Sequence, residues 1–360
     1  MNFYHNFFEQ APWILRLNFI LSLCFLFITL AMVGFMLYLR LHKNVRARRK
    51  KFLDTILIEF VNSYLFDEDF DKKAQTEKIN QKHLKTDFDR KMAIKQILMF
   101  NENLKGESTL AIKELFINLN LYQLVLRDLK NRNWHKKARA LFVFSQLSVE
   151  VPTKIVEPLL NDKKGEVRQQ ALLYFLKLSV NNPLGFLDKI KRPLTRWQQI
   201  YIENGLKYAE NIVVPDFSKW LNHNLDSVVS FCIRMIAEFN QFENIDKLMP
   251  FIAHEKEEVK LEAINSLCRM EDISLIPILI SRFDKESIAV KSEILKVIKS
   301  IGSYEDLKIL SNSMNKEKWN IKIEYHRVAC HFKPELKHKI FSKKVGLDKS
   351  SFTPPLLQSL

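Results

Sequence analysis

The chain has 360 residues, 47% of them hydrophobic, with a formal net charge of +15, seven glycines and four cysteines. Seven of the positive charges lie between residues 40 and 51, which leaves an ordinary excess of +8 on the rest, so a nucleic-acid partner is not favoured. The glycines are scattered singly and no HExxH pair is present, so we expect no catalytic residues, no cofactor, no metal site and no small-molecule substrate.

The first predicted element is a membrane-spanning helix at residues 19–39, preceded by an aromatic-rich tip at residues 1–18. These 21 residues carry no charged side chain and are mostly Phe, Leu and Ile. At about 1.5 Å per residue, such a helix matches the ~30 Å hydrocarbon core of a bilayer. It is apolar all round, unlike a buried amphipathic helix, and no small-residue cleavage site follows it, unlike a signal peptide.

Positive charge is concentrated after this segment, because only Arg16 precedes it and a basic juxtamembrane segment, residues 40–51, follows it. This asymmetry predicts a single-pass protein with its N-terminus out and the rest in the cytoplasm, at the inner membrane if the source is bacterial. The basic segment either binds anionic lipid headgroups or only fixes the topology. Its candidate residues are Arg40, Lys43, Arg46, Arg48, Arg49, Lys50 and Lys51.

Residues 52–83 are predicted to form an amphipathic helix and then an acidic and polar linker. Apolar and aromatic residues recur at helical spacing along the predicted helix, which ends near residue 66: Phe52, Ile56, Phe60 and Tyr64.

The acidic cluster at residues 67–71 does not fit a calcium loop, since Lys72 and Lys78 stand where glycine and glutamate are needed. We expect this cluster to face the preceding basic segment, and we expect residues 72–83 to be a linker.

Residues 84–133 are predicted to be atypical capping helices. Helical patterns begin at Asp87, Ser108 and Leu121, but they do not keep the register of the repeats that follow. Terminal units of a repeat array have to cover an otherwise exposed core face, which explains such irregularity.

From residue 134 to residue 332 one pattern recurs every 31 residues. Apolar residues stand four, eight and eleven positions after each start, a spacing that puts them on one helical face. An earlier apolar run in each unit predicts a first helix, so each unit is a pair of helices too small to bury its own apolar face. Pro158, Pro250 and Pro277 fall in the first helices and are expected to bend or delay them.

These helix pairs, with a proline in the first helix and VR or VK opening the second, resemble short HEAT repeats, which have an armadillo-type fold. The resemblance implies an α-solenoid of HEAT-like helix pairs. Together with the apolar segment, it predicts an all-α protein whose α-solenoid is preceded by one transmembrane helix. It implies protein–protein interaction without specifying a function, because such solenoids host many unrelated roles. The short subtype includes bilin-attaching lyases, so a HEAT-like lyase or enzyme subunit is one alternative and a nucleic-acid-binding solenoid is another.

Charged residues also recur along the repeats and form a ladder. They are either a recognition groove for a partner chain or a set of exposed ion pairs, worth ~0–1 kcal/mol each. Their alternating signs favour the ion pairs. The ladder residues are Arg168, Lys260, Glu262, Lys291, Glu293, Lys322 and Glu324.

Residues 333–360 are predicted to be a C-terminal cap and a flexible tail. The whole pattern predicts a membrane-anchored, non-catalytic scaffold that presents a cytoplasmic solenoid to a membrane-associated protein partner. A membrane envelope enzyme such as a glycosyltransferase is the client suggested by similar anchored repeat chains, and no residue of this chain carries that expectation.

Overall fold

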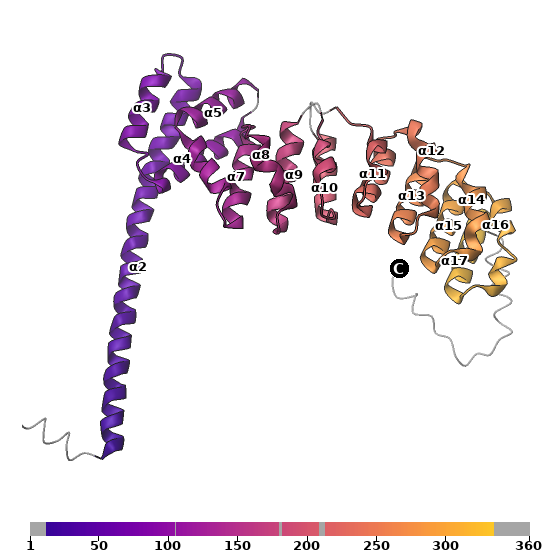
Figure 1. Ribbon diagram of the computed structural model, residues 1–360, viewed down its shortest axis with the longest axis horizontal. Coiled ribbons are helices and arrows are strands. Elements are labelled where there is room, and N and C mark those ends of the chain that lie inside the picture. The colour runs from indigo at the N-terminus through magenta and orange to yellow at the C-terminus, as the bar shows by residue number, and fades with distance from the viewer. Residues whose placement is uncertain (1–11, 105, 180–181, 209–212, 335–360) are drawn as a thin grey trace, which may run out of the picture. The chain divides into compact units, whose positions relative to one another are not determined.

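The computed structural model describes residues 12–104, 106–179, 182–208 and 213–334, and these residues form helices and no strands. Contacts divide the chain into two compact units, residues 1–149 and 150–360, which are described separately. The first unit contains six helices within the described residues (Figure 1): α2 (Trp13–Phe66), α3 (Lys72–Lys82), α4 (Asp87–Asn103), α5 (Glu107–Asn118), α6 (Leu121–Leu129) and α7 (Trp134–Gln146).

Helix α2 is continuous over 54 residues, where a span, a basic segment and a separate amphipathic helix were expected. Neither proline nor glycine occurs after Gly34 within it, so no residue breaks the hydrogen-bond ladder when the composition changes from apolar to basic. The N-terminal half of the helix extends away from the unit, and α3, α4 and α5 lie around its C-terminal half (Figure 1).

The buried stripe of α2 includes the predicted Phe60 and Tyr64, which are 9% and 1% exposed, but it shifts by one position toward the N-terminus of the stripe. There Leu53 and Leu57 are no more than 1% exposed, whereas the predicted Phe52 is 49% exposed. Apolar residues stand at both sets of positions, so periodicity could not choose between them, and the packing of α4 on α2 decides the face.

Helix α3 occupies residues that were expected to be a linker. The side chain of Asp71 caps it by accepting a hydrogen bond from the Ala74 amide (3.0 Å). The helix buries only Thr76 and Ile79, which explains why its apolar pattern was too weak to detect. The acidic cluster at 67–71 also follows the C-terminal end of α2, whereas the basic segment lies in the middle of that helix, ~24 Å away along its axis, so these charges do not face one another.

Helices α4, α5 and α6 begin within one residue of the predicted starts. A capping box explains the first of them: the Thr86 hydroxyl accepts from the Asp89 amide, and the Asp89 carboxylate accepts from the Thr86 amide. Their apolar faces meet in a core that includes Ile97, Leu115 and Phe116.

The second unit is a helical repeat. Its longer helices follow one another side by side (Figure 1): α9 (Gly165–Leu178), α10 (Arg196–Tyr208), α11 (Asp226–Glu238), α13 (Glu257–Arg269), α15 (Ile288–Ile301) and α17 (Trp319–Phe332). Successive starts differ by 31, 30, 31, 31 and 31 residues. The predicted apolar columns face the core, as shown by Ala171, Cys232, Ala263 and Ile294, which are fully buried.

The shorter helices vary along the second unit. They are α8 (Thr153–Val156) with η1 (Glu157–Asn161), η2 (Gly185–Lys189), η3 (Phe217–Trp220), η4 (Phe242–Asn244), α12 (Ile245–Leu248) with η5 (Met249–Ala253), α14 (Leu275–Arg282) with η6 (Phe283–Lys285), and α16 (Tyr304–Ile309) with η7 (Ser313–Lys316). Pro158 and Pro250 stand at the first turns of η1 and η5, where a tighter helix replaces the α-helix. Before α10 and α11 only the turns η2 and η3 are present.

The N-terminal tip is described only from residue 12 onward, and most of the predicted C-terminal cap and tail, residues 335–360, lies outside the described residues.

Candidate functional site

Two of the three lysines of the predicted ladder form ion pairs between consecutive repeats. The Nζ atom of Lys260, on α13, lies 2.5 Å from Oε2 of Glu286, and that of Lys291, on α15, lies 2.5 Å from Oε1 of Glu317. Each glutamate stands just before the next long helix, so each pair joins one repeat to the next. None of the four side chains is more than 16% exposed, so these pairs are shielded from solvent.

Most of the other ladder residues also have partners. Oε2 of Glu262 lies 3.6 Å from Nη1 of Arg234, and Oε2 of Glu293 lies 2.8 Å from Nζ of Lys296. Two ladder cations donate hydrogen bonds to backbone carbonyl oxygens: Arg168 and Lys322. The remaining residue, Glu324, is half-buried on α17. These contacts favour ion pairs that stabilise the array over a charged groove left free for a partner.

A polar seam joins α10 to α11. Nη2 of Arg234 donates to Oε1 of Gln199 (3.0 Å), and its Nε lies 3.8 Å from Oε2 of Glu203. The guanidinium carbon is 5.7 Å from the centre of the Phe231 ring. Burial lowers the pKa of Arg234, and its Nε and Nη1 atoms have no hydrogen-bond partner among the described residues. The seam therefore depends on polar contacts that are only partly satisfied.

A second network lies nearby and links three successive long helices. Nζ of Lys207 on α10 bonds Glu203 (2.8 Å) and Glu238, and Nη2 of Arg269 on α13 lies 2.6 Å from Oε2 of Glu238. The hydrogen bonds from Lys207 and Arg269 hold the pKa of the Glu238 carboxyl below its usual value. Glu238 thus remains charged and connects α10, α11 and α13.

An exposed aromatic face lies on α10. Trp197, Tyr201 and Tyr208 stand at positions i, i+4 and i+11 of the helix and therefore share one side of it. They are 70%, 44% and 81% exposed. Soluble surfaces seldom leave several large rings together without a role, and tryptophan and tyrosine dominate the binding energy of protein interfaces.

The repeat columns do not point to this face, because they mark core positions only. Ile202 and Leu206 fill those columns in α10 and are buried. A search for large aromatic residues outside the columns would have found Trp197, Tyr201 and Tyr208, since the periodicity already assigns them to the opposite side.

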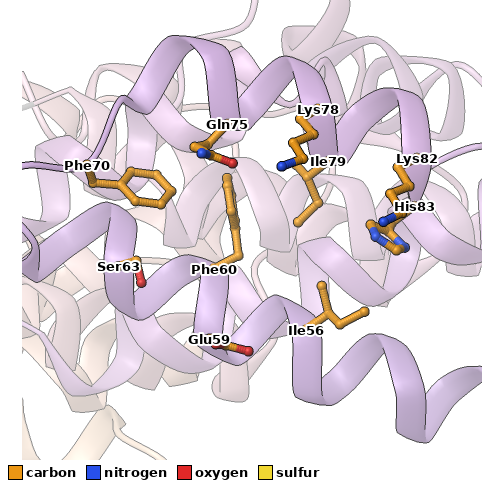
Figure 2. Close-up of a pocket in the computed structure, with 10 residues that line it drawn as sticks. All are labelled: Ile56, Glu59, Phe60, Ser63, Phe70, Gln75, Lys78, Ile79, Lys82 and His83. Atoms are coloured by element: carbon orange, nitrogen blue, oxygen red, sulfur yellow. The ribbon is translucent and has the colours of Figure 1, made fainter.

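The best-defined pocket of the first unit lies between α2 and α3 and has a volume of about 250 Å³. Its floor is apolar and its rim carries lysine, glutamate and amide groups. Figure 2 shows Ser63 and His83 at opposite ends of the pocket, so these two side chains do not form a nucleophile–base pair. The lining residues are Ile56, Glu59, Phe60, Ser63, Phe70, Gln75, Lys78, Ile79, Lys82 and His83.

No group of three or more metal-binding side chains occurs among the described residues. Cys232 is buried in its repeat column, and burial raises the pKa of its thiol, so it has the environment of a core residue.

The N-terminal half of α2 is long and apolar enough to cross a membrane, with a mean hydropathy of 2.6 in its most apolar window. None of that window is buried within the molecule, and rings such as Phe25, Phe27 and Phe35 are more than 60% exposed. A membrane span and a signal sequence share these properties.

Six of the seven basic residues proposed to meet lipid are exposed, and Arg49 is the exception. Its Nε atom lies 3.1 Å from Oδ1 of Asp89, and its Nη2 atom donates to the carbonyl of His83 (3.1 Å). Burial acts to raise the pKa of Asp89, but hydrogen bonds from Arg49 and Thr86 keep it below its usual value. Arg49 therefore fastens α2 to the start of α4 and is not free to bind a headgroup.

No protein-family model and no curated protein sequence matches the chain. Among solved structures, an engineered protein is similar over 77% of this chain and 78% of its own length, with 12% identity and a TM-score of 0.30. Another engineered protein covers 72% of this chain and 97% of its own, with 14% identity and a TM-score of 0.24. Kap121p is similar over 82% of this chain and 35% of its own, with 12% identity and a TM-score of 0.29.

Proposed function

We propose that the chain is a membrane-anchored, non-catalytic scaffold whose HEAT-like repeats bind a membrane-associated protein partner in the cytoplasm. The observation that carries this proposal is the aromatic face of α10, which presents Trp197, Tyr201 and Tyr208 to solvent. It lies on a repeat array whose ladder charges are largely held by ion pairs or by hydrogen bonds to the backbone.

The anchor in this proposal is the 19–39 segment of α2. An exposed helix of this length and composition leaves a large apolar surface in contact with water unless lipid covers it. The basic residues that follow it favour the N-out, C-in orientation. Anchoring confines the scaffold and a membrane partner to one surface, which raises their effective concentration without any added contact.

The partner is proposed to dock on α10 because its surface combines rings with neighbouring ion pairs. Large aromatic side chains lose little conformational entropy on binding, and a polar surround excludes water from the contact. A charged network on α10 and the end of α11 provides these polar groups: Glu203, Lys207 and Glu238. The ladder residues are assigned to stability in this proposal, not to partner binding.

The test is site-specific photo-crosslinking of the full-length chain in native membranes. A benzophenone amino acid at Tyr201 should capture a stoichiometric partner, whereas the same group at Phe242, which is 55% exposed on a turn, should not. The double variant Trp197→Ala, Tyr208→Ala should lose co-purification of that partner.

Equal capture from positions 201 and 242, or none from either with the chain still folded, would argue against the scaffold. The orientation has its own test: a protease added outside sealed cells should leave the repeats intact. Digestion of the repeats from outside would reject the N-out orientation. The partner site would still be tested by the crosslinking experiment.

A further inference from the structure

We propose that the first unit carries a second lipid-contacting surface, formed by Lys82, Lys85, Lys130 and Arg132, which binds the anionic headgroups of the bilayer that α2 crosses. The proposal rests on the membrane span proposed above. It adds a surface made by tertiary structure to the basic segment of α2 itself, and we call it the headgroup surface.

Arg49 fixes how far this surface lies from the apolar segment of α2, measured along the helix axis. We call this distance its height. Its hydrogen bonds to His83 and Asp89 hold the α3–α4 turn, residues 83–86, beside position 49 of α2. Because α2 is one continuous helix, position 49 lies ten residues, or ~15 Å, beyond the end of the apolar segment at Leu39. The headgroup layer occupies roughly the first 5–8 Å of that distance. The turn is thus within about one Debye length, ~8–10 Å, of the headgroups.

Helix α3 runs antiparallel to α2, so its two ends differ in height. Near its start, Nζ of Lys72 lies 5.1 Å from the centre of the Tyr64 ring; at its end, His83 meets Arg49. Lys82 and Lys85 therefore lie at the end nearer the apolar segment, and Lys73 lies ~14 Å farther away along α3.

The end of α6 lies at the same level as the α3–α4 turn. Arg127 pairs with Asp87 at the start of α4, and Nζ of Lys91 lies 3.8 Å from Oδ2 of Asp128. Lys130 and Arg132 follow directly after α6, so these contacts place them at the same end of the unit.

This end of the first unit has an excess of positive charge. Its three carboxylates are each paired with a cation, since Asp87 pairs with Arg127, Asp89 with Arg49 and Asp128 with Lys91. Four exposed cations are left without a carboxylate partner among the described residues: Lys82, Lys85, Lys130 and Arg132.

The positive charge of the headgroup surface indicates which ligand binds it. A surface of four unpaired cations, held at a fixed height by a helix that continues into the bilayer, fits anionic phospholipid headgroups in that same bilayer. A basic residue at an anionic surface contributes up to about a fivefold factor in binding, and this factor decreases over a Debye length. The tether removes most of the entropic cost of bringing the surface to the lipid.

The test uses the full-length chain in nanodiscs of phosphatidylcholine alone or of phosphatidylcholine mixed with phosphatidylglycerol. Amine footprinting with mass spectrometry measures how fast each lysine is modified. The acidic lipid should slow the modification of Lys82, Lys85 and Lys130 by up to about fivefold each, and high salt should reverse the effect. Lys73, exposed at the far end of α3, serves as the matched control and should react equally in both discs.

A charge-reversal pair completes the design. Lys82→Glu with Lys85→Glu should remove the lipid-dependent protection of Lys130, whereas Lys73→Glu with Lys95→Glu should retain it. Equal modification of Lys82 and Lys73 in an embedded chain would overturn the headgroup surface and leave the span intact. Extraction of the wild-type chain from vesicles by alkaline carbonate would overturn the span and the headgroup surface together.

Discussion

The last three repeats and the repeat built on α10 use the same helix positions in different ways. In α13, α15 and α17 one position carries Glu262, Glu293 and Glu324, and in α10 that position carries Tyr201. The last repeats have α12, α14 or α16 as a first helix, whereas only the turn η2 precedes α10. The regular repeats hold Lys260, Lys291 and their glutamate partners in ion pairs, whereas α10 exposes Trp197 and Tyr201.

This contrast separates what stabilises the array from what is available to a partner. Substitutions in the regular repeats should change the free energy of unfolding, and substitutions on the face of α10 should change binding with little effect on stability. Four predictions test the separation, in order of decreasing effect on stability.

The largest effect is expected from Leu267→Asp in α13. Leu267 is fully buried in a repeat column, so the variant places a charge with no partner between stacked helices. We expect a loss of at least ~3 kcal/mol in the free energy of unfolding. Hydrogen exchange of the full chain in micelles should show reduced protection of α11, α13 and α15 together. Ile273→Asp, at a residue 68% exposed, is the control and should leave exchange unchanged.

The next effect is expected at the ladder. Lys291→Ala leaves the Glu317 carboxylate, only 10% exposed, without its cation. We expect a loss of about 2 kcal/mol, measured from the midpoint of urea unfolding. The double variant Lys291→Met, Glu317→Leu removes both charges and should recover most of the loss. If the single variant were as stable as the wild type, the ladder would not stabilise the contact between repeats, and partner binding would become its better explanation.

A smaller, pH-dependent effect is expected at Glu238. Hydrogen bonds from Lys207 and Arg269 keep its pKa below the unfolded value, so its contribution is present above the unfolded pKa of ~4.3 and is lost as pH falls through the folded pKa. Glu238→Gln should therefore be less stable than the wild type at pH ~7, by no more than about 1 kcal/mol, and the difference should shrink near pH ~3.5. A difference that grew on acidification would contradict the assignment.

The smallest effect on stability is expected on the aromatic face. Because Trp197 is 70% exposed, Trp197→Ala should change the free energy of unfolding by no more than about 0.5 kcal/mol while it weakens partner capture. A variant that unfolds α10 would show instead that the ring stabilises the repeat, which would remove the basis of the proposed interface.

The starts of several helices were predictable because local signals specify them. Asp87 and Leu121 begin helices as expected, and Thr86 and Asp89 form the capping box at the first of these starts. The repeat columns were equally accessible, since a period of four, four and three residues requires only the geometry of a helix. The helical character of residues 72–82 was missed because α3 buries only two side chains.

The candidate surfaces were less predictable. The basic segment was visible in the sequence, but the separate role of Arg49 was not, because Asp89 lies 40 residues away along the chain. The ladder was visible as a pattern, yet its pairing of Lys260 with Glu286 needs the spacing between stacked helices. The headgroup surface was the least predictable from the sequence, because it combines the ends of α3 and α6.

The sequence by itself determined most of the helices, the period of the repeats, the apolar segment and the placement of charge around that segment. All of these depend on neighbours within a few turns, which composition and spacing describe completely. Only the tertiary structure decided which charges are neutralised, which rings stay exposed and which turns lie at the height of Arg49. Those outcomes depend on contacts between residues distant in sequence, and the energy of a buried or exposed group is set by what packs against it.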